Sequence, residues 1–120
     1  MKRILVVEND LLLALFNKRF CESLGHTVVH CVRTGAEAIE SVKKNQIDVI
    51  IMDIRIDGEI DGIETMHRIR KFSDVQVVYV SGNSEPSLIS RAEETGMLAF
   101  CIKPISIEDL KNILSEKLPQ

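Results

Sequence analysis

The sequence predicts an α/β domain built around one parallel sheet. Short apolar runs alternate five times with helix-like segments, and these runs cover residues 4–7, 27–31, 49–52, 75–80 and 98–102. The first, third and fourth runs are nearly continuous in Val and Ile, which is typical of strands that are covered on both faces. A helix-like segment follows each run, so we expect five βα units joined by right-handed crossovers.

The capping residues predict where the five helices begin and end. The expected starts are Asp10, the capping box of Thr34 and Glu37, Asp61, the segment 84–86 with its proline, and Ser106. Each of these places a side-chain acceptor, or a proline, at the first turn of a helix. Gly25 and Gly96 are the expected stops of the first and fourth helices, because glycine favours the left-handed conformation that ends many helices.

Three predicted helices carry apolar residues at helical spacing. In the first helix these are Leu12, Leu13, Phe16, Phe20 and Leu24, in the third they are Ile63, Met66 and Ile69, and in the fifth they are Ile107, Leu110, Ile113, Leu114 and Leu118. The run 11–16 is much too short to span a bilayer. We interpret it as core packing.

Composition indicates one ordinary globular domain, and we treat residues 1–120 as a single unit. A formal net charge of -3 argues against direct nucleic-acid binding, which usually needs a basic face. Three scattered cysteines without CxxC spacing are interpreted as reduced thiols packed as small hydrophobes, which together with the lack of a signal or membrane segment predicts a cytoplasmic protein. The tail is either a natural end or a boundary before another domain.

Chemically useful side chains follow four of the predicted strands. They are Glu8, Asn9 and Asp10 after the first strand, Asp53 after the third, Ser81 after the fourth and Lys103 after the fifth. Open α/β sheets bind ligands outside the carboxyl ends of their strands, so we expect these side chains to converge at one edge. Each alone would be an ordinary polar loop residue, and the prediction depends on their coincidence.

Together these residue types suit phosphoryl transfer. A carboxylate such as Asp53 can attack phosphorus and form an aspartyl-phosphate. Neighbouring acids need a cation to offset their repulsion, and Mg²⁺ prefers such oxygen ligands. Lys103 could act as a point charge on a phosphate oxygen, and the hydroxyl of Ser81 could donate to another.

The segments 4–10, 49–53, 61–64, 78–82 and 100–104 resemble the receiver domains of bacterial two-component systems, including the single-domain chemotaxis type. The resemblance covers the whole chain in order. It implies a flavodoxin-like (βα)5 fold with strand order 2-1-3-4-5 and a cytoplasmic phosphorelay role. The implied partners are a sensor histidine kinase or histidine phosphotransfer protein, and a downstream target or fused output domain. It also implies no membrane contact and a homodimer that forms on phosphorylation.

The same resemblance implies a role for each site residue. Asp53 would be the phosphoacceptor, assisted by Lys103 and Ser81. Glu8, Asn9, Asp53 and the backbone carbonyl of Arg55 would hold Mg²⁺ or another divalent cation such as Mn²⁺. Ser81 and Phe100 would form the switch that changes the face of helix four, strand five and helix five, and the bond from Lys103 to Pro104 would be cis. The domain would catalyse only its own phosphorylation and dephosphorylation, so we do not expect a conventional enzyme.

Two features depart from the family pattern. Asn9 stands where a second acid is usual, which predicts weaker metal binding with activity retained. The loop 54–60 is one residue longer than is common and lacks a proline. We interpret Asp57 and Glu59 as solvated loop acids, with Gly58 taking the turn.

Three other functions are weighed against phosphoryl acceptance. A degenerate receiver that binds partners without accepting phosphate is supported by Asn9 alone. A haloacid-dehalogenase-like phosphatase would need an acid two residues beyond the nucleophile, where this chain has Arg55. A flavodoxin is disfavoured because the loop of Glu8, Asn9 and Asp10 is acidic where a phosphate-binding loop should be rich in glycine or hydroxyl groups.

Overall fold

The computed structural model describes residues 1–117, in which five strands alternate with five helices. The elements are β1 (Arg3–Val7), α1 (Leu11–Ser23), β2 (Thr27–Val32), α2 (Gly35–Lys44), β3 (Val49–Asp53), α3 (Gly62–Ile69), β4 (Gln76–Ser81), α4 (Pro86–Glu93), β5 (Ala99–Ile102) and α5 (Ile107–Asn112). A π-helical turn, Ile113–Lys117, continues α5. Every predicted strand is present, with its ends shifted by one residue or less.

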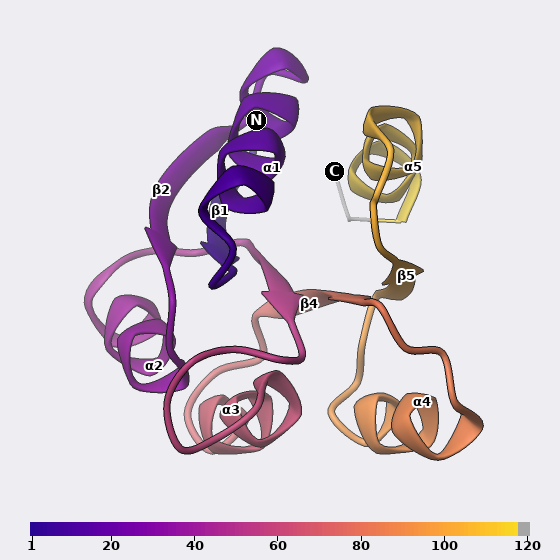
Figure 1. Ribbon diagram of the computed structural model, residues 1–120. Coiled ribbons are helices and arrows are strands. Elements are labelled where there is room, and N and C mark those ends of the chain that lie inside the picture. Colours follow the sequence, from indigo (N-terminus) through magenta and orange to yellow (C-terminus); the bar gives the residue numbers. More distant parts are fainter. Residues whose placement is uncertain (118–120) are drawn as a thin grey trace.

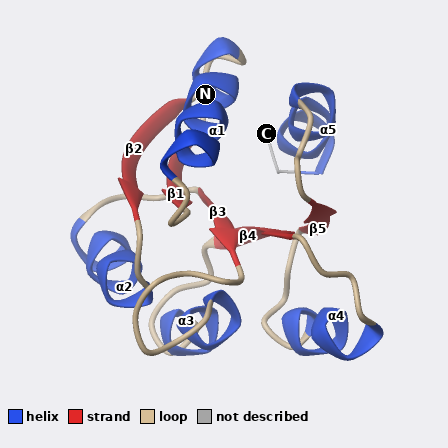
Figure 2. Ribbon diagram, viewed as in Figure 1, coloured by secondary structure: helices blue, strands red, loops and turns tan. Residues whose placement is uncertain are grey.

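The strands form one parallel sheet in the order β2-β1-β3-β4-β5, which confirms the flavodoxin-like prediction. Helices α1 and α5 cover one face of this sheet, and α2, α3 and α4 cover the other (Figure 1). The strands run through the middle of the molecule between these two helical layers (Figure 2). All five strands point the same way, so the loops after them gather at one edge.

The core consists of two apolar clusters, one on each face of the sheet. Successive residues of a strand point to opposite faces, so β1 gives Ile4 and Val6 to the cluster under α1 and α5 and gives Leu5 and Val7 to the other. All five residues of β3 are buried. The near-continuous apolar runs of the sequence therefore reflect strands that are covered on both faces.

The predicted packing face of α1 is only partly confirmed, because Phe20 and Leu24 pack against the core but much of the bulky apolar run at the start of the helix is exposed. Leu11 is 71% exposed and Leu12 is 58% exposed, while Leu15 and Phe16 are also exposed. The helix buries a stripe of smaller side chains instead, namely Ala14, Asn17 and Cys21. Small residues let the helix approach the sheet closely, and the bulky residues then face outward. Among residues 1–117, no helix is long and apolar enough to cross a membrane.

The helix caps confirm most of the predicted starts. Asp10 accepts hydrogen bonds from the backbone of α1, Thr34 from Glu37, Asp61 from Glu64 and Ser106 from Asp109. Gly25 and Gly96 have positive φ, as their predicted roles as helix stops require. These signals are local in sequence, which is why they could be read without the tertiary structure.

Two smaller predictions are only partly confirmed. In α5, Leu110, Ile113 and Leu114 are buried, but Ile107 is exposed because it lies in the first turn, at the open end of the helix. The predicted member Leu118 lies outside the described residues. Of the cysteines, Cys21 is buried and Cys101 is half-buried, whereas Cys31 is exposed because it lies on β2, at the edge of the sheet.

Helix α4 is attached to the rest of the domain at its carboxyl end. The buried Tyr79 hydroxyl lies 2.7 Å from Thr95 Oγ1, which in turn donates to the carbonyl of Ala92. Arg70 Nε donates to the carbonyl of Thr95 at 2.7 Å. At the other end, the cap residue Glu85 makes no side-chain hydrogen bond to the helix.

Candidate functional site

Two buried acids lie at the carboxyl edge of the sheet. Asp53 is the last residue of β3 and Glu8 directly follows β1, and each residue is 3% exposed. Because β1 and β3 are adjacent and parallel, their ends bring the two side chains together. A buried carboxylate is costly unless a partner compensates its charge, so the structure must supply one.

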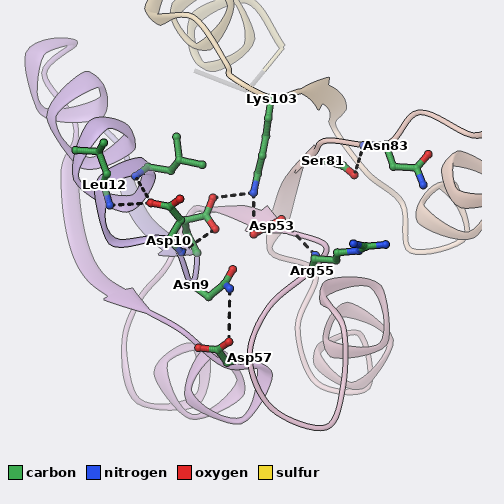
Figure 3. Close-up of polar contacts among 11 residues, drawn as sticks. Asn9, Asp10, Leu12, Asp53, Arg55, Asp57, Ser81, Asn83 and Lys103 are labelled. Carbon is green, nitrogen blue, oxygen red and sulfur yellow. Dashed lines mark hydrogen bonds and ion pairs between the residues drawn. The ribbon is translucent and has the colours of Figure 1, made fainter.

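Lys103 supplies that charge from the loop after β5. Its ammonium lies 2.9 Å from Asp53 Oδ2 and 3.0 Å from Glu8 Oε1, and Figure 3 shows the Lys103 side chain pointing toward Asp53. The backbone N–H of Lys103 donates to the carbonyl of Ser81, which ties β5 to β4 at this point. The bond from Lys103 to Pro104 is cis, as the resemblance implied.

These neighbours change the affinity of the site for protons. Burial, followed by the adjacent Glu8, raises the pKa of Asp53 from 3.8 to about 7, although Lys103 opposes the shift. Burial lowers the pKa of Lys103, but the carboxyl groups of Asp53 and Glu8 outweigh that effect and leave it raised. Asp53 therefore needs more positive charge than Lys103 provides before it is fully ionised at neutral pH.

The side-chain amide of Asn9 also lies beside Glu8 and Asp53. One terminal atom of its amide lies 2.9 Å from the backbone carbonyl oxygen of Arg55 and 3.2 Å from each of Glu8 Oε2 and Asp53 Oδ2. Among residues 1–117, no three His, Cys, Asp or Glu side chains gather into a metal-binding group. The oxygen-bearing groups that meet here are the carboxylates of Glu8 and Asp53, the amide of Asn9 and the carbonyl of Arg55. Such oxygens suit a hard divalent cation.

A pocket of about 310 Å³ opens beside the acids. It is lined by Asp53, Arg55, Ser81, Gly82, Asn83 and Lys103. The structure thus brings the predicted acceptor, hydroxyl and lysine to one pocket. Sequence reasoning missed Asn83, whose backbone N–H donates to Ser81 Oγ at 3.1 Å. Its position two residues after Ser81, in the loop that follows β4, was the available signal.

Two predicted residues lie away from this pocket. Asp10 caps α1 by accepting from the backbone of Leu12 and Leu13, which confirms its interpretation as a cap. Phe100 is half-buried against the cluster under α2, α3 and α4, and its ring centroid lies 6.4 Å from that of Tyr79. The switch role of Phe100 stays a prediction.

The long loop after β3 differs from its predicted description. Gly58 has φ +97°, so it takes the turn as expected. Asp57, however, is more than a solvated acid, because its Oδ2 pairs with Arg33 Nη2 at 2.9 Å and its backbone bridges to Thr34. Its Oδ1 lies 3.5 Å from Asn9 Nδ2. Contacts between two loops cannot be read from either loop alone.

Comparison with known proteins shows the family of the chain. The model of the response regulator receiver domain matches residues 4–115. The transcriptional regulatory protein PdtaR of Mycobacterium tuberculosis (strain CDC 1551 / Oshkosh) is 28% identical over 109 residues, covering 91% of this chain and 53% of PdtaR. The sporulation initiation phosphotransferase F of Bacillus subtilis (strain 168) is 27% identical over 124 residues, covering 98% of this chain and 94% of that protein.

Solved structures agree on the fold. A CheY-like receiver domain protein from Methanospirillum hungatei JF-1 superimposes with a TM-score of 0.89 at 23% identity, covering 98% of this chain and 93% of the other. The N-terminal domain of a response regulator/sensory box/GGDEF protein from Carboxydothermus hydrogenoformans gives 0.84 at 27% identity, covering 94% and 90%. This chain spans about half the length of the first curated relatives that it matches. It belongs to the response regulator receiver domains of two-component systems.

Proposed function

We propose that this receiver domain accepts a phosphoryl group on Asp53. The observation that carries the proposal is the position of the Asp53 carboxyl group, buried at the end of β3 and open to a pocket that also contains Lys103 and Ser81. In the reaction, one carboxylate oxygen of Asp53 forms a bond to phosphorus while the bond from phosphorus to the donor atom breaks. The relative from Bacillus subtilis, which the chain covers almost completely, is named a phosphotransferase.

Mg²⁺ or a similar divalent cation fits the acids beside the pocket. Glu8, Asn9, Asp53 and the carbonyl of Arg55 would hold it, since the Asn9 amide already lies within hydrogen-bonding distance of the other three groups. Receiver domains as a family bind Mg²⁺. When bound, the cation supplies positive charge that offsets the charge of the transferring group.

The other residues of the pocket act on the phosphoryl oxygens. The ammonium of Lys103, already 2.9 Å from Asp53, can move with the new phosphate and neutralise one of its oxygens. The hydroxyl of Ser81 can donate to a second oxygen, because among residues 1–117 it only accepts, from the backbone of Asn83. The chemistry of the chain is therefore positioning and charge compensation.

An exposed apolar patch on α1 supports a protein as the phosphodonor. Receiver domains interact with histidine kinases and with output domains. Leu11, Leu12, Leu15 and Phe16 are exposed on α1, which starts immediately after the loop of Glu8 and Asp10. A partner that delivers a phosphohistidine to Asp53 must cover this rim, and a contiguous apolar surface is typical of a docking site. The expected donor is a histidine kinase or histidine phosphotransfer protein.

Phosphorylation then changes which partners bind to the face formed by α4, β5 and α5. Ser81 would move toward the phosphate, and Phe100 would change its packing beside Tyr79. Phe100 lies on β5, so this movement alters the face of α4, β5 and α5. That face would bind a downstream target, a fused output domain or a second phosphorylated copy of the chain.

The alternative is a receiver that binds partners without accepting phosphate. It depends on Asn9, which supplies no negative charge where an acid is usual. The intact geometry of Asp53, Lys103 and Ser81 favours phosphoryl acceptance over this alternative.

Intact mass after incubation with acetyl phosphate and Mg²⁺ tests the proposal. We expect the parent to gain one phosphoryl group, and both an Asp53→Asn variant and a chelator to abolish the gain. Labelling with a phosphohistidine donor serves as the second arm. If neither donor adds a phosphoryl group at saturating Mg²⁺, the proposal is wrong and the receiver that binds partners without accepting phosphate is favoured.

A further inference from the structure

The Asn9 amide lies between two groups of acceptors. On one side, a terminal atom lies 2.9 to 3.2 Å from oxygens of Arg55, Glu8 and Asp53. On the other side, the second terminal atom lies 3.5 Å from Asp57 Oδ1, the contact drawn in Figure 3. Since every one of these neighbours is an acceptor, the two ends of the amide compete for the same kind of partner.

The two orientations of this amide have different consequences for a cation. If the nitrogen points inward, it donates to Glu8, Asp53 and Arg55 and so takes the place that a cation would fill. If the oxygen points inward, four oxygens meet, an arrangement that is favourable only around a cation. The nitrogen then points outward and donates to Asp57. An amide has one donor end and one acceptor end, so its orientation decides whether it competes with the metal or binds it.

Asp57 is fixed where it can influence this choice. Its Oδ2 is held by Arg33, with Nη2 at 2.9 Å and Nε at 3.3 Å, which leaves Oδ1 free to face Asn9. The backbone of Asp57 bridges to that of Thr34, the residue that caps α2. Gly58 turns the chain immediately afterwards. Both the backbone and the side chain of Asp57 are thus held against the loop between β2 and α2.

We propose that Asp57, held by Arg33, is a positioning residue that turns the Asn9 amide so that its oxygen faces the cation site. An outward nitrogen lies 3.5 Å from a carboxylate oxygen of Asp57 and is attracted to it, whereas an outward oxygen would face that carboxylate and be repelled. This inference rests on the proposed metal site and adds the residue that prepares it. Groups that orient a metal ligand commonly affect metal affinity even though they do not touch the metal.

The two departures from the family pattern are connected by this arrangement. A carboxylate at position 9 would present two equivalent oxygens and would need no orientation. The amide of Asn9 does need it, and the unusually long loop supplies Asp57 for that purpose. The effect of Asp57 should therefore depend on the residue at position 9.

The first test is Mg²⁺ affinity, measured by calorimetry on the parent, Asp57→Ala and Glu59→Ala. Glu59 is the matched control, because it lies in the same loop, is exposed, carries the same charge and makes no hydrogen bond or ion pair within the described residues. We expect Asp57→Ala to weaken Mg²⁺ binding by roughly tenfold, and Glu59→Ala to weaken it by less than about twofold. Asp57→Asn, which keeps an acceptor oxygen, should lie between the parent and Asp57→Ala.

The second test repeats both alanine variants in an Asn9→Asp background. A carboxylate at position 9 has no donor to offer Asp57, so Asp57→Ala should bind Mg²⁺ as tightly as Glu59→Ala there, or more tightly. Equal weakening in both backgrounds would show that Asp57 acts only through its charge, and it would overturn the inference. Thermal unfolding with a chelator checks that every variant folds.

The outcomes separate this inference from the proposed function. If the parent binds Mg²⁺ and the Asp57→Ala and Glu59→Ala variants bind it with equal affinity, the role of Asp57 is overturned. The proposal that Asp53 accepts a phosphoryl group is then unaffected. A parent that binds no Mg²⁺ overturns the metal site and this inference together. The intact-mass experiment, with its Asp53→Asn variant, reports whether Asp53 accepts phosphate whichever way the role of Asp57 is decided.

Discussion

Lys103 and Asp53 face each other across 2.9 Å at the end of the sheet, and the Lys103 side chain is 23% exposed while that of Asp53 is 3% exposed. The same ammonium lies 3.0 Å from Glu8. One lysine therefore serves two buried carboxyl groups. Burial, together with the neighbouring Glu8, raises the pKa of Asp53 to about 7 despite Lys103, so a further cation would favour the ionised carboxylate.

Replacing Lys103 with methionine should destabilise the protein when a chelator is present. The substitution keeps most of the side-chain length but removes the cation from two buried acids, so we expect a loss of about 3 kcal/mol at slightly alkaline pH. Saturating Mg²⁺ should restore much of the loss, as measured by urea unfolding. Lys44→Met is the matched control, because Lys44 forms an exposed pair with Glu40 and its loss should change little. Equal effects of the two substitutions would contradict this account.

Asp53→Asn should stabilise the protein more at alkaline than at acidic pH. The pKa of Asp53 rises from 3.8 to about 7, so the folded chain holds this proton more tightly than the unfolded chain. The stabilising contribution of the bound proton is present below about pH 4 and is lost as the pH rises through about 7. Asparagine does not ionise, so we expect a gain of about 1 to 2 kcal/mol at alkaline pH, with little gain near pH 4.

The measurement is thermal unfolding of parent and variant across this pH range with a chelator present. Asp74→Asn, an exposed aspartate between α3 and β4, is the control. A gain from Asp53→Asn that did not vary with pH would contradict the raised pKa.

Asn9→Asp should tighten Mg²⁺ binding and weaken the fold in the presence of a chelator. The new carboxylate would lie beside Glu8 and Asp53, where it adds charge to the cation site. We expect affinity to rise by about tenfold, measured by calorimetry. Without a cation, three neighbouring acids repel one another, so the melting temperature should fall. An affinity no tighter than that of the parent would show that charge at position 9 does not limit binding.

Gly62→Ala should disturb the site through the backbone. A methyl group at Gly62 would meet the carbonyl oxygen of Asp53, Met52 Cγ at 2.8 Å and Ile54 Cα at 3.0 Å, and backbone atoms cannot turn aside. We expect a loss of about 2 to 3 kcal/mol in urea unfolding, together with slower phosphorylation. Gly82→Ala is the matched control, because a methyl group there meets no atom within 4 Å. Its unfolding free energy should change by less than about 0.5 kcal/mol.

The sequence was sufficient to predict most of the fold because its signals are local. The capping residues Asp10, Thr34 and Asp61 lie within three residues of the backbone groups that they cap, so their roles are visible in a short window. The continuous run in β3 indicated burial on both faces. The meeting of Asp53 with Lys103 followed from the parallel sheet, whose strand ends share one edge.

The remaining errors arose where tertiary packing decides. Apolar periodicity in α1 suggested that Leu12 and Phe16 would be buried, but the helix packs through Ala14 and Cys21. Periodicity identifies an apolar face without showing which surface it meets. The pairing of Asp57 with Arg33 joins two separate loops, and no pattern within either loop encodes it.

The attachment of α4 through Thr95 implies unequal local stability along that helix. Its last turn is anchored to Tyr79 and Arg70, whereas its first turn, at Pro86, follows an exposed loop and lacks a side-chain cap. Backbone amides near Leu88 should therefore exchange with deuterium faster than those near Ala92. The helix can then unwind and re-form from its amino end without detaching, so this surface can adopt alternative shapes while the domain stays folded.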